Sequence, residues 1–277
     1  MLALAHAAIP DAFEVATVDH GLRPESAAEA AMVAQHCAEL GVPHEVLAVD
    51  VAPGNLQDRA RAARYAALAQ WLDRRDLSAL ATAHHADDQA ETLIMRLNRG
   101  SGLAGLAGVR GRGRVPGTSY PLLRPLLAWR RAQLADVVRS KGWEAAQDPS
   151  NRDPKYDRVR IRTALADADW LDPNTIARSA TNLADAVEAL DWATEREWCE
   201  RVEEGAGELR YRPEAPRSIR LEILKRAIVR LGGEARGSAI ASLLDTLEAG
   251  GGGTLGGAHA INRRGVWIIR SEPPRNC

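Results

Sequence analysis

The residues best suited to chemistry lie together in one short segment, His84–Thr92. The segment contains two adjacent histidines, one amide and three carboxylates: His84, His85, Gln89, Asp87, Asp88 and Glu91. Histidine can carry protons or contact phosphate, and carboxylates can hold Mg²⁺ or orient an amine. The helix dipole alone favours acids in a first helical turn by roughly 0.3–1 kcal/mol. That effect explains one or two acids, so the whole set favours a functional site.

A second polar cluster, Asp19–Arg23, reads Asp-His-Gly-Leu-Arg. Its Asp-His-Gly part is also typical of an ordinary turn before a helix. The planar guanidinium of Arg23 suits phosphate, because it can donate two parallel hydrogen bonds. If this cluster faces the same crevice as His84–Thr92, then Asp19, His20 and Arg23 become candidates for nucleotide binding.

Strands and helices alternate around these clusters. Strands are predicted over Phe13–Val18, His44–Val49 and Leu77–Ala83, and helices over Glu25–Leu40, Asn55–Arg74 and Ala86–Leu97. This alternation indicates βαβ units and an α/β fold with a doubly wound parallel sheet. Such sheets bind ligands at the carboxyl ends of their strands, where both polar clusters fall. The sequence therefore predicts an active site at that end of the sheet.

The first residues, Met1–Ala8, have the composition of the second half of a helix that ends near Pro10. No Ser, Thr, Asp or Asn precedes them as a cap, and no strand leads into them. A parallel core that opens in this way would leave an apolar sheet edge uncovered. We therefore expect that at least one strand and its following loop are missing ahead of Met1.

Charge is spread unevenly along the chain, although the formal net charge is −1. Residues 1–95 carry 6 Lys and Arg against 14 Asp and Glu, which gives −8. Residues 96–162 carry 15 against 5, which gives +10, and residues 163–277 carry 15 against 18, which gives −3. A basic block in an otherwise acidic chain favours a polyanionic partner bound at one place. A solvated arginine-rich surface is the alternative.

Two segments of the basic block suit nucleic acid. A glycine-rich connector over Asn98–Arg114 is predicted to be loop-like and carries Arg99, Arg110, Arg112 and Arg114. The turn-rich segment Asp148–Arg162 includes Asp148, Asn151, Arg152, Arg158, Arg160 and Arg162. Arginines at this density neutralise phosphates, and Asp or Asn among them can contact a base edge or a metal. A solvated linker between domains is the alternative for the second segment.

The remaining chain is predicted to form a smaller, mainly helical domain. After a helix over Trp129–Lys141, helices are predicted over residues 174–204, 217–231 and 237–249, and short strands over 257–262 and 265–270. We place the boundary near residue 170, which divides the chain into domains of residues 1–170 and 171–277.

Composition argues against several classes of protein. Hydrophobic residues make up 45% of the chain, which is enough for a globular core, and no apolar run approaches the roughly 20 residues of a membrane helix. Met1–Ala8 lacks the basic leader of a signal peptide. Cys37, Cys199 and Cys277 are far apart, which argues against a disulfide framework and a cysteine zinc site. Such cysteine usage fits a reducing cytosol.

In combination, the motifs resemble those of the bacterial tRNA(Ile)-lysidine synthetase family, which are N-type ATP pyrophosphatases with a PP-loop. The matching segments are Val18–Ser26, Ala83–Glu91, Arg99–Leu106, Asp148–Asn151, Tyr156–Arg162 and Thr254–Gly257. The resemblance therefore spans nearly the whole chain. It implies an adenine nucleotide α-hydrolase-like catalytic domain followed by a smaller helical domain that contacts tRNA.

The resemblance also implies a cytoplasmic ligase that forms a C–N bond. Family members attach lysine to C2 of wobble cytidine 34 in the isoleucine tRNA with a CAU anticodon. ATP and Mg²⁺ first adenylate the C2 oxygen with release of pyrophosphate, and the lysine ε-amine then displaces AMP. The target base must leave its stack to be reached. The implied partners are tRNA(Ile), L-lysine and ATP, and a homodimer is one arrangement that we consider.

Carried onto this chain, the resemblance gives each cluster a role. Asp88, Glu91 and Asp87 become the catalytic carboxylates, and Asp88 also becomes the metal ligand. ATP and lysine are expected to contact Asp19, His20, Arg23, His84, His85 and Gln89. The tRNA is expected to contact Arg99, Arg110, Arg112, Arg114, Asp148, Asn151, Arg152, Arg158, Arg160 and Arg162.

Two features depart from the family. The Ser-Gly-Gly-x-Asp-Ser pyrophosphate loop, which cradles phosphates at a helix N-terminus, is not in this chain. Met1–Ala8 corresponds to the helix that follows that loop. Val159 stands where the family usually has Asn. We therefore interpret the sequence as N-terminally truncated by a start site placed too late, and we expect the chain as written to lack lysine transfer.

Two other functions stay open. A different ATP-dependent tRNA-modifying PP-loop enzyme, such as a thiolase, would usually need paired or catalytic cysteines, and this chain has no Cys-x-x-Cys. A catalytically inactive tRNA-binding remnant is the other alternative. The presence of Asp87, Asp88, Glu91, Asp148 and Arg158 favours an enzyme over a remnant. The coding sequence upstream of Met1 would decide, because an intact enzyme requires the pyrophosphate loop in frame.

Overall fold

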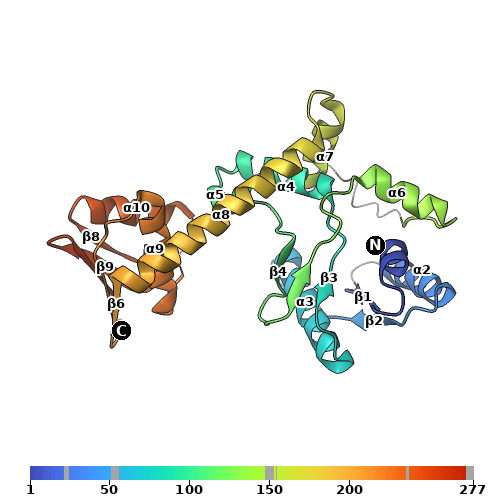
Figure 1. Ribbon diagram of the computed structural model, residues 1–277, viewed down its shortest axis with the longest axis horizontal. Helices are drawn as coiled ribbons and strands as arrows, with labels where there is room; N and C mark the ends of the chain where they lie inside the picture. Colours follow the sequence, from blue (N-terminus) through green and yellow to red (C-terminus); the bar gives the residue numbers. More distant parts are fainter. Residues whose placement is uncertain (22–24, 51–55, 147–152, 154, 235–236, 273–277) are drawn as a thin grey trace. The chain divides into compact units, whose positions relative to one another are not determined.

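The computed structural model describes residues 1–277 except 22–24, 51–55, 147–152, 154, 235–236 and 273–277 (Figure 1). The chain forms two compact units, Met1–Ala184 and Asp185–Cys277, and each is described by itself. The division falls within the long helix α8, Pro173–Arg201. The domain boundary that the sequence predicts near residue 170 lies ahead of this division and stays a prediction.

The first half of the first unit alternates strands and helices, as the sequence predicts. The elements are α1 (Leu2–Ala8), β1 (Val15–Asp19), α2 (Glu25–Glu39), β2 (His44–Ala48), α3 (Leu56–Arg75), β3 (Leu80–Ala81) and α4 (Ala86–Asn98). β1 and β2 pair in parallel, with Val15 opposite His44. β3 is shorter than the predicted strand Leu77–Ala83, because its neighbour β5 (Pro121–Leu123) offers only three residues for pairing.

The region after α4 is more regular than the sequence predicts. The connector Asn98–Arg114 contains a short helix, α5 (Leu103–Leu106), and ends in the strand β4 (Arg112–Arg114). β4 pairs antiparallel with β5, and β5 pairs in parallel with β3. Strands of three residues that contain Gly or Pro show no alternation, so the pattern of apolar residues could not reveal them. The helix α6 (Arg131–Ser140) lies within the predicted range.

A further helix, α7 (Asp157–Asp167), occupies part of the segment that the sequence analysis interpreted as basic and turn-rich. Its arginines at every second position interrupt any apolar stripe, and none of its residues is buried. Because helix prediction rests on a stripe of period 3.6, this helix gave no signal. α7 nevertheless packs along α4, beside the predicted catalytic residues (Figure 1).

Helix α3 covers the strands that lead to the predicted site. Its buried side chains Trp71 and Leu72 pack in one cluster with Leu47 of β2 and Leu80 of β3. Full burial of such an apolar side chain stabilises a fold by about 1.5–3 kcal/mol. This cluster fixes β3, and β3 in turn fixes the start of α4, which follows it after a short connection.

The two sheets of the first unit, β1-β2 and β3-β5-β4, are not joined by strand pairing among the described residues. A large apolar cavity of about 740 Å³ lies between them and is lined by Val15–Val18 of β1 and by Leu80 and Ala81 of β3. α1 also lines it through Leu2 and Leu4. The additional strand that the sequence analysis expects stays a prediction.

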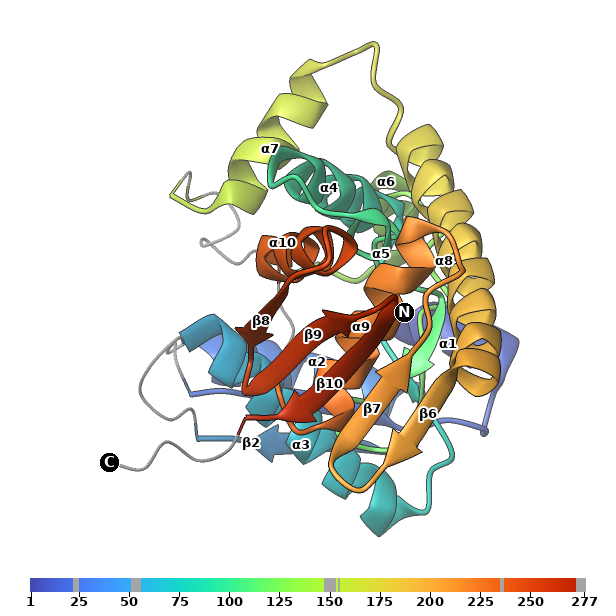
Figure 2. The ribbon, with the colours of Figure 1, turned by 90° about the vertical axis from the view of Figure 1, so that its left-hand side faces the viewer.

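The second unit is built on an antiparallel sheet. Its elements after α8 are β6 (Val202–Gly205), β7 (Glu208–Tyr211), α9 (Arg217–Arg230), α10 (Gly237–Glu248), β8 (Gly252–Leu255), β9 (Ala258–Arg263) and β10 (Val266–Ser271). The strand order is β6-β7-β10-β9-β8 (Figure 2). β9, β10 and the helices lie where the sequence predicts them. β6, β7 and β8 were not predicted, because acids in β6 and glycines in β8 hide any apolar alternation and β7 has only four residues. None of the described helices is long and apolar enough to cross a membrane.

The core of the second unit generates a stability prediction. Ile228 of α9 is 0% exposed and packs with Trp267, whereas its neighbour Val229 is 57% exposed. Ile228→Ala should lower the free energy of unfolding by about 2–5 kcal/mol, because it leaves a cavity in the core. Val229→Ala, the matched control, should change it by less than about 0.5 kcal/mol. Urea unfolding followed by circular dichroism measures both, and equal effects would contradict this core.

Candidate functional site

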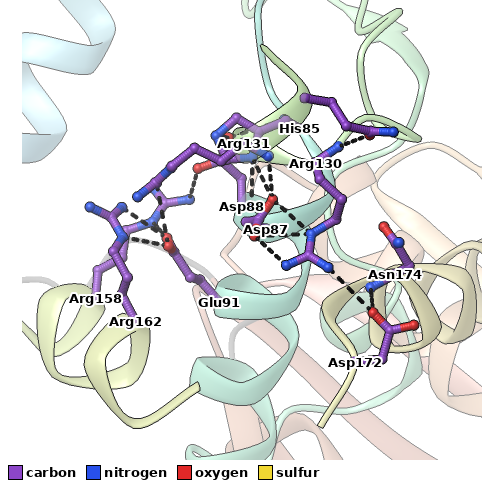
Figure 3. A network of polar contacts seen from close by, with 11 residues as sticks. His85, Asp87, Asp88, Glu91, Arg130, Arg131, Arg158, Arg162, Asp172 and Asn174 are labelled. Atoms are coloured by element: carbon purple, nitrogen blue, oxygen red, sulfur yellow. Dashed lines mark hydrogen bonds and ion pairs between the residues drawn. The ribbon is translucent and has the colours of Figure 1, made fainter. Parts of the chain in front are cut away.

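Helix α4 begins with a reciprocal cap. The His85 ring accepts a hydrogen bond at Nδ1 from the backbone N–H of Asp88 (3.3 Å), and the Asp88 carboxylate accepts one from the backbone N–H of His85 (3.1 Å). The pair satisfies two backbone donors that the helix itself leaves open. The cap fixes both side chains and so directs the carboxylates of the first two turns (Figure 3).

Asp87 is held by the start of α6. Its carboxylate accepts hydrogen bonds from Nε and Nη2 of Arg130 (3.2 and 3.1 Å) and from the backbone N–H of Arg131 (2.7 Å). Burial by itself would raise the pKa of Asp87, but the Arg131 N–H and the Arg130 guanidinium outweigh it, so the pKa is lowered. Asp87 is therefore ionised at neutral pH, and it links α4 to α6.

Glu91 is 1% exposed, so its charge depends on partners within the protein. Arg162 of α7 donates to it through Nε at 2.6 Å and Nη2 at 3.2 Å, and Arg158 donates through Nε at 2.7 Å. The two arginines are one helical turn apart and therefore reach the same carboxylate. Arg131 Nη2 lies 3.7 Å away. The hydrogen bonds with Glu91 also raise the pKa of Arg162.

Asp88 connects the cap to the arginines. One of its oxygens accepts from Nη2 of Arg158 (3.2 Å), while the other accepts from His85. The cluster thus brings three carboxylates together with four guanidinium groups: Asp87, Asp88, Glu91, Arg130, Arg131, Arg158 and Arg162 (Figure 3). Because charges of both signs alternate within it, the cluster can exchange ion pairs with a ligand that also carries both signs.

Burial favours the neutral form of both histidines. It lowers the pKa of His84 and of His85. This effect outweighs the nearby carboxylates, which raise both pKa values and of which Asp88 has the largest effect. His84 Nδ1 shares a hydrogen bond with Thr82 Oγ1 (3.0 Å). His85 already accepts at Nδ1, so its proton lies on Nε2. Neutral imidazoles next to carboxylates are suited to proton transfer at neutral pH.

A cavity of about 490 Å³ opens beside the cluster. Its charged lining consists of Asp87, Glu91, Arg130, Arg131, Arg162, Asp169 and Asp172. Its apolar lining consists of Leu165, Ala166, Ala168, Leu171 and Pro173, from the end of α7, the segment that follows it and the first residue of α8. A cavity with this lining suits a ligand that has charged ends and an aliphatic stem between them.

The other predicted ligand contacts lie at the end of β1. Asp19 accepts hydrogen bonds from the Ser26 hydroxyl (2.7 Å) and the Gly21 N–H (2.9 Å), and both lower its pKa. His20 Nε2 accepts from Arg64 Nε at 3.3 Å. Within the described part of the chain, neither Asp19 nor His20 is hydrogen-bonded or ion-paired to α4. Arg23 lies outside the described residues, so the nucleotide role of this cluster stays a prediction.

The predicted RNA-binding residues divide into three groups. Arg158 and Arg162 join the carboxylate cluster, whereas Arg99 and Arg160 both pair with Asp157, at 3.0 and 2.5 Å. Three more are exposed on the connector: Arg110, Arg112 and Arg114. Asp148, Asn151 and Arg152 lie outside the described residues. Of the predicted RNA-binding residues that the structure describes, Arg158 and Arg162 are thus the two that pair with the predicted catalytic acids.

Arg130, Arg131 and Asp172 were not among the site residues predicted from the sequence. Arg130 bridges Asp87 and Asp172, with 3.4 Å to the latter, and Arg131 contributes its backbone N–H and its side chain. One signal was available. Two adjacent arginines at the start of a predicted helix are disfavoured by the helix dipole, so carboxylates from elsewhere were needed to compensate them.

The described residues contain no cluster of three His, Cys, Asp or Glu side chains arranged to hold a metal ion. Asp88, the predicted metal ligand, has its oxygens committed to Arg158 and to the His85 N–H. As arranged, these side chains offer no ready set of Mg²⁺ ligands, and the role predicted for Asp88 as a metal ligand stays a prediction.

Comparisons with known proteins show which chains this one is similar to. A family model described as a PP-loop domain matches residues 1–169. The tRNA(Ile)-lysidine synthase of Novosphingobium aromaticivorans is 51% identical over 95% of this chain and 82% of its own length. The enzyme of that name from Zymomonas mobilis is 40% identical over the same shares. Among solved structures, the U34-tRNA thiolase NcsA of Methanococcus maripaludis, with its 4Fe–4S cluster, aligns with a TM-score of 0.52 over 66% of this chain and 65% of its own. At 16% identity, that likeness shows the fold alone.

The lowered pKa of Asp87 predicts how its contribution to stability depends on pH. An acid whose pKa is lower in the folded chain stabilises the fold above its unfolded pKa, about 3.9, and less as pH falls through the folded value. Asp87→Asn should therefore lower the free energy of unfolding by about 1.5–3 kcal/mol at pH 7 and by much less at pH 3.

Urea unfolding at the two pH values measures this difference. Asp136→Asn is the matched control, because Asp136 is 63% exposed and its ion pair with Arg139 should contribute little at either pH. The ion-pair account of Asp87 fails if Asp87→Asn is equally destabilising at pH 7 and at pH 3.

Proposed function

The chain belongs to the tRNA(Ile)-lysidine synthase family, and on that premise we propose that it joins lysine to the wobble cytidine of an isoleucine tRNA with a CAU anticodon. ATP use accords with the PP-loop domain. The observation that carries the proposal is the cluster of Asp87, Asp88 and Glu91 with arginines from α6 and α7, beside an amphipathic cavity.

We assign this cavity to lysine, because lysine matches its lining group by group. The α-carboxylate of lysine can exchange into the guanidinium pairs, and Arg130 and Arg131 are the candidates at the start of α6. The methylene stem suits Leu165 and Leu171. The ε-ammonium then needs an acid, and Asp87 and Glu91 face the same cavity. Such a ligand replaces ion pairs that these side chains already make, so little charge is left uncompensated.

Nucleophilic attack requires the lysine amine without its extra proton. His84 is suited to accept that proton, since burial lowers its pKa and favours the neutral imidazole at neutral pH. Its Nδ1 is oriented by Thr82, which directs the ring. The adenylated base then loses AMP as the amine bonds to C2, so the bond that breaks is the one between C2 and the activated oxygen.

Mg²⁺ is expected to arrive with ATP. The described carboxylates of α4 are committed to arginines, so they offer no ready set of ligands, whereas ATP phosphates usually supply part of the Mg²⁺ coordination. No step is therefore assigned to a protein-bound metal. We expect the enzyme to act in the cytoplasm, where tRNA is modified, and a homodimer stays a prediction.

Thiolation is a weaker candidate than lysine ligation. Cys37 is 0% exposed, and burial raises the pKa of its thiol, so it is not the low-pKa thiolate that sulfur chemistry requires. Cys199 is exposed, but it lies in the second unit, and Cys277 is outside the described residues. The likeness to a tRNA thiolase extends to the fold alone.

A transfer assay tests the proposal directly. The protein is expressed with any residues encoded in frame upstream of Met1 and is incubated with radiolabelled lysine, ATP, Mg²⁺ and a tRNA(Ile) transcript that carries the CAU anticodon. The chain as written, which is expected to lack lysine transfer, is assayed beside it. We expect label in the tRNA that depends on ATP, and none when an otherwise identical transcript carries uridine at the wobble position. Equal labelling of the two transcripts would contradict the proposal, and so would labelling without ATP. No transfer at all, alongside retained tRNA binding, would favour a tRNA-binding protein without this activity.

The exposed arginines of the connector generate a binding prediction. Among the described residues, Arg112 and Arg114 on β4 make no ion pair, so both are open to phosphate. Each phosphate contact releases counterions, so tRNA affinity should fall steeply as salt rises. Arg112→Ala and Arg114→Ala should each weaken binding and reduce the slope of log affinity against log salt by about 0.7–0.9.

Fluorescence anisotropy with labelled tRNA at several salt concentrations measures that slope. Arg196→Ala is the matched control, because this exposed arginine of α8 pairs with Glu200 and lies outside the basic block. It should leave the slope unchanged. A slope that is flat in the parent chain, or unchanged in both connector variants, would exclude the connector as a phosphate-binding surface.

A further inference from the structure

Gln89 occupies a position that the proposed mechanism does not use. It is the fourth residue of α4 and is 3% exposed. It does not line the cavity that we assign to lysine. Its amide makes two hydrogen bonds with the backbone of one residue of the connector. Nε2 donates to the Val109 carbonyl oxygen (2.6 Å), and Oε1 accepts from the Val109 N–H (2.7 Å). Gln89 thus pairs with Val109 as a neighbouring strand would.

The residue before Val109 is shaped to allow this contact. Gly108 has a φ of +66°, a conformation that residues with a Cβ rarely adopt. A Cβ built on Gly108 would lie 2.6 Å from Oε1 of Gln89 and 3.4 Å from Cβ of Ala180. The space next to the amide is therefore filled, and only glycine lets the connector approach α4 this closely.

Other side chains fix the connector on either side of Val109. Arg96 of α4 donates to the carbonyl oxygens of Gly105 and Gly108, the latter at 3.3 Å. Arg124 donates to the carbonyl oxygen of Arg110 at 2.7 Å. Since β4 begins at Arg112, the backbone from Gly105 to the start of β4 is held against α4 and β5. The exposed arginines of the connector follow directly after the Gln89 contact.

We propose that Gln89 is a positioning residue for tRNA binding. Its amide holds Val109, and Val109 sets where Arg110, Arg112 and Arg114 stand relative to the carboxylates at the start of α4. The inference rests on the proposed function, because it assigns the connector arginines to the tRNA phosphates. It replaces the expectation that Gln89 contacts ATP or lysine, since both polar groups of its side chain are already used within the protein.

Two variants break the same contact from opposite sides. Gln89→Leu removes both hydrogen bonds and keeps a side chain of similar size. Gly108→Ala keeps Gln89 but places a methyl group against its amide oxygen. Gly100→Ala is the matched control, because Gly100 has a φ of +64° in the same connector and a Cβ there meets nothing within 4 Å. The control carries the same backbone strain without disturbing Gln89.

The readouts separate positioning from folding and from direct contact with substrate. Dissociation constants are measured for the tRNA(Ile) transcript and for lysine, and amide hydrogen exchange is measured at Val109. We expect Gln89→Leu and Gly108→Ala each to weaken tRNA binding by about five- to tenfold and to expose the Val109 amide. Lysine affinity should stay within about twofold. The double variant should bind tRNA as tightly as the single variant with the lower tRNA affinity, because both changes disrupt one contact.

Each contrary outcome has its own meaning. Weakened lysine or ATP binding with unchanged tRNA binding would overturn the proposal and support Gln89 as a direct ligand contact. Unchanged tRNA binding in a chain whose Val109 amide has lost its protection would also overturn it. An equal loss of tRNA binding in Gly100→Ala would assign the effect to backbone strain, which contradicts a role for Gln89. If the parent chain does not bind tRNA, the proposed function itself fails, and this inference fails with it.

Discussion

A carboxylate that is 1% exposed must find cations inside the protein, and Glu91 finds them on two other helices. An unpaired buried charge costs several kcal/mol, so α7 has to dock with Arg158 and Arg162 toward α4. α6 has to follow, because Arg130 and Arg131 compensate Asp87 at the same helix start. The arrangement of the helices around the carboxyl end of β3 therefore depends on the charges of α4.

The same compensation prepares the site for its proposed substrate. Lysine carries both charges and an aliphatic stem, and the cavity beside the cluster offers acids, guanidinium groups and leucines. Binding then becomes an exchange of partners instead of the burial of new charge. The proposed tRNA contacts depend on the same helix. tRNA phosphates are expected at Arg112 and Arg114, which are close in sequence to Val109, and Gln89 of α4 holds Val109. On this proposal, the small-molecule and the tRNA contacts both depend on α4.

The central part of the site could be predicted from the sequence, because it lies in one segment after a well-patterned strand. His85, Asp88 and Glu91 are brought together by local helical spacing alone. The arginine partners could not be predicted, since Glu91 and Arg162 meet only through tertiary packing. The apolar pattern found α2 and α3 but missed α7 and β4, whose sequences alternate arginine with other residues. The ligand contact predicted for Gln89 stays a prediction, because a buried amide that holds the backbone and one that binds a ligand have the same sequence signal.

The central claim is that the charges around α4 select lysine by both of its ends. Isothermal titration calorimetry of the chain with ATP present tests it, with L-lysine compared against L-norleucine, which keeps the stem and the α-groups but lacks the ε-ammonium. The account predicts that lysine binds at least about tenfold more tightly, equivalent to about 1.4 kcal/mol. Equal affinities for the two amino acids would contradict it.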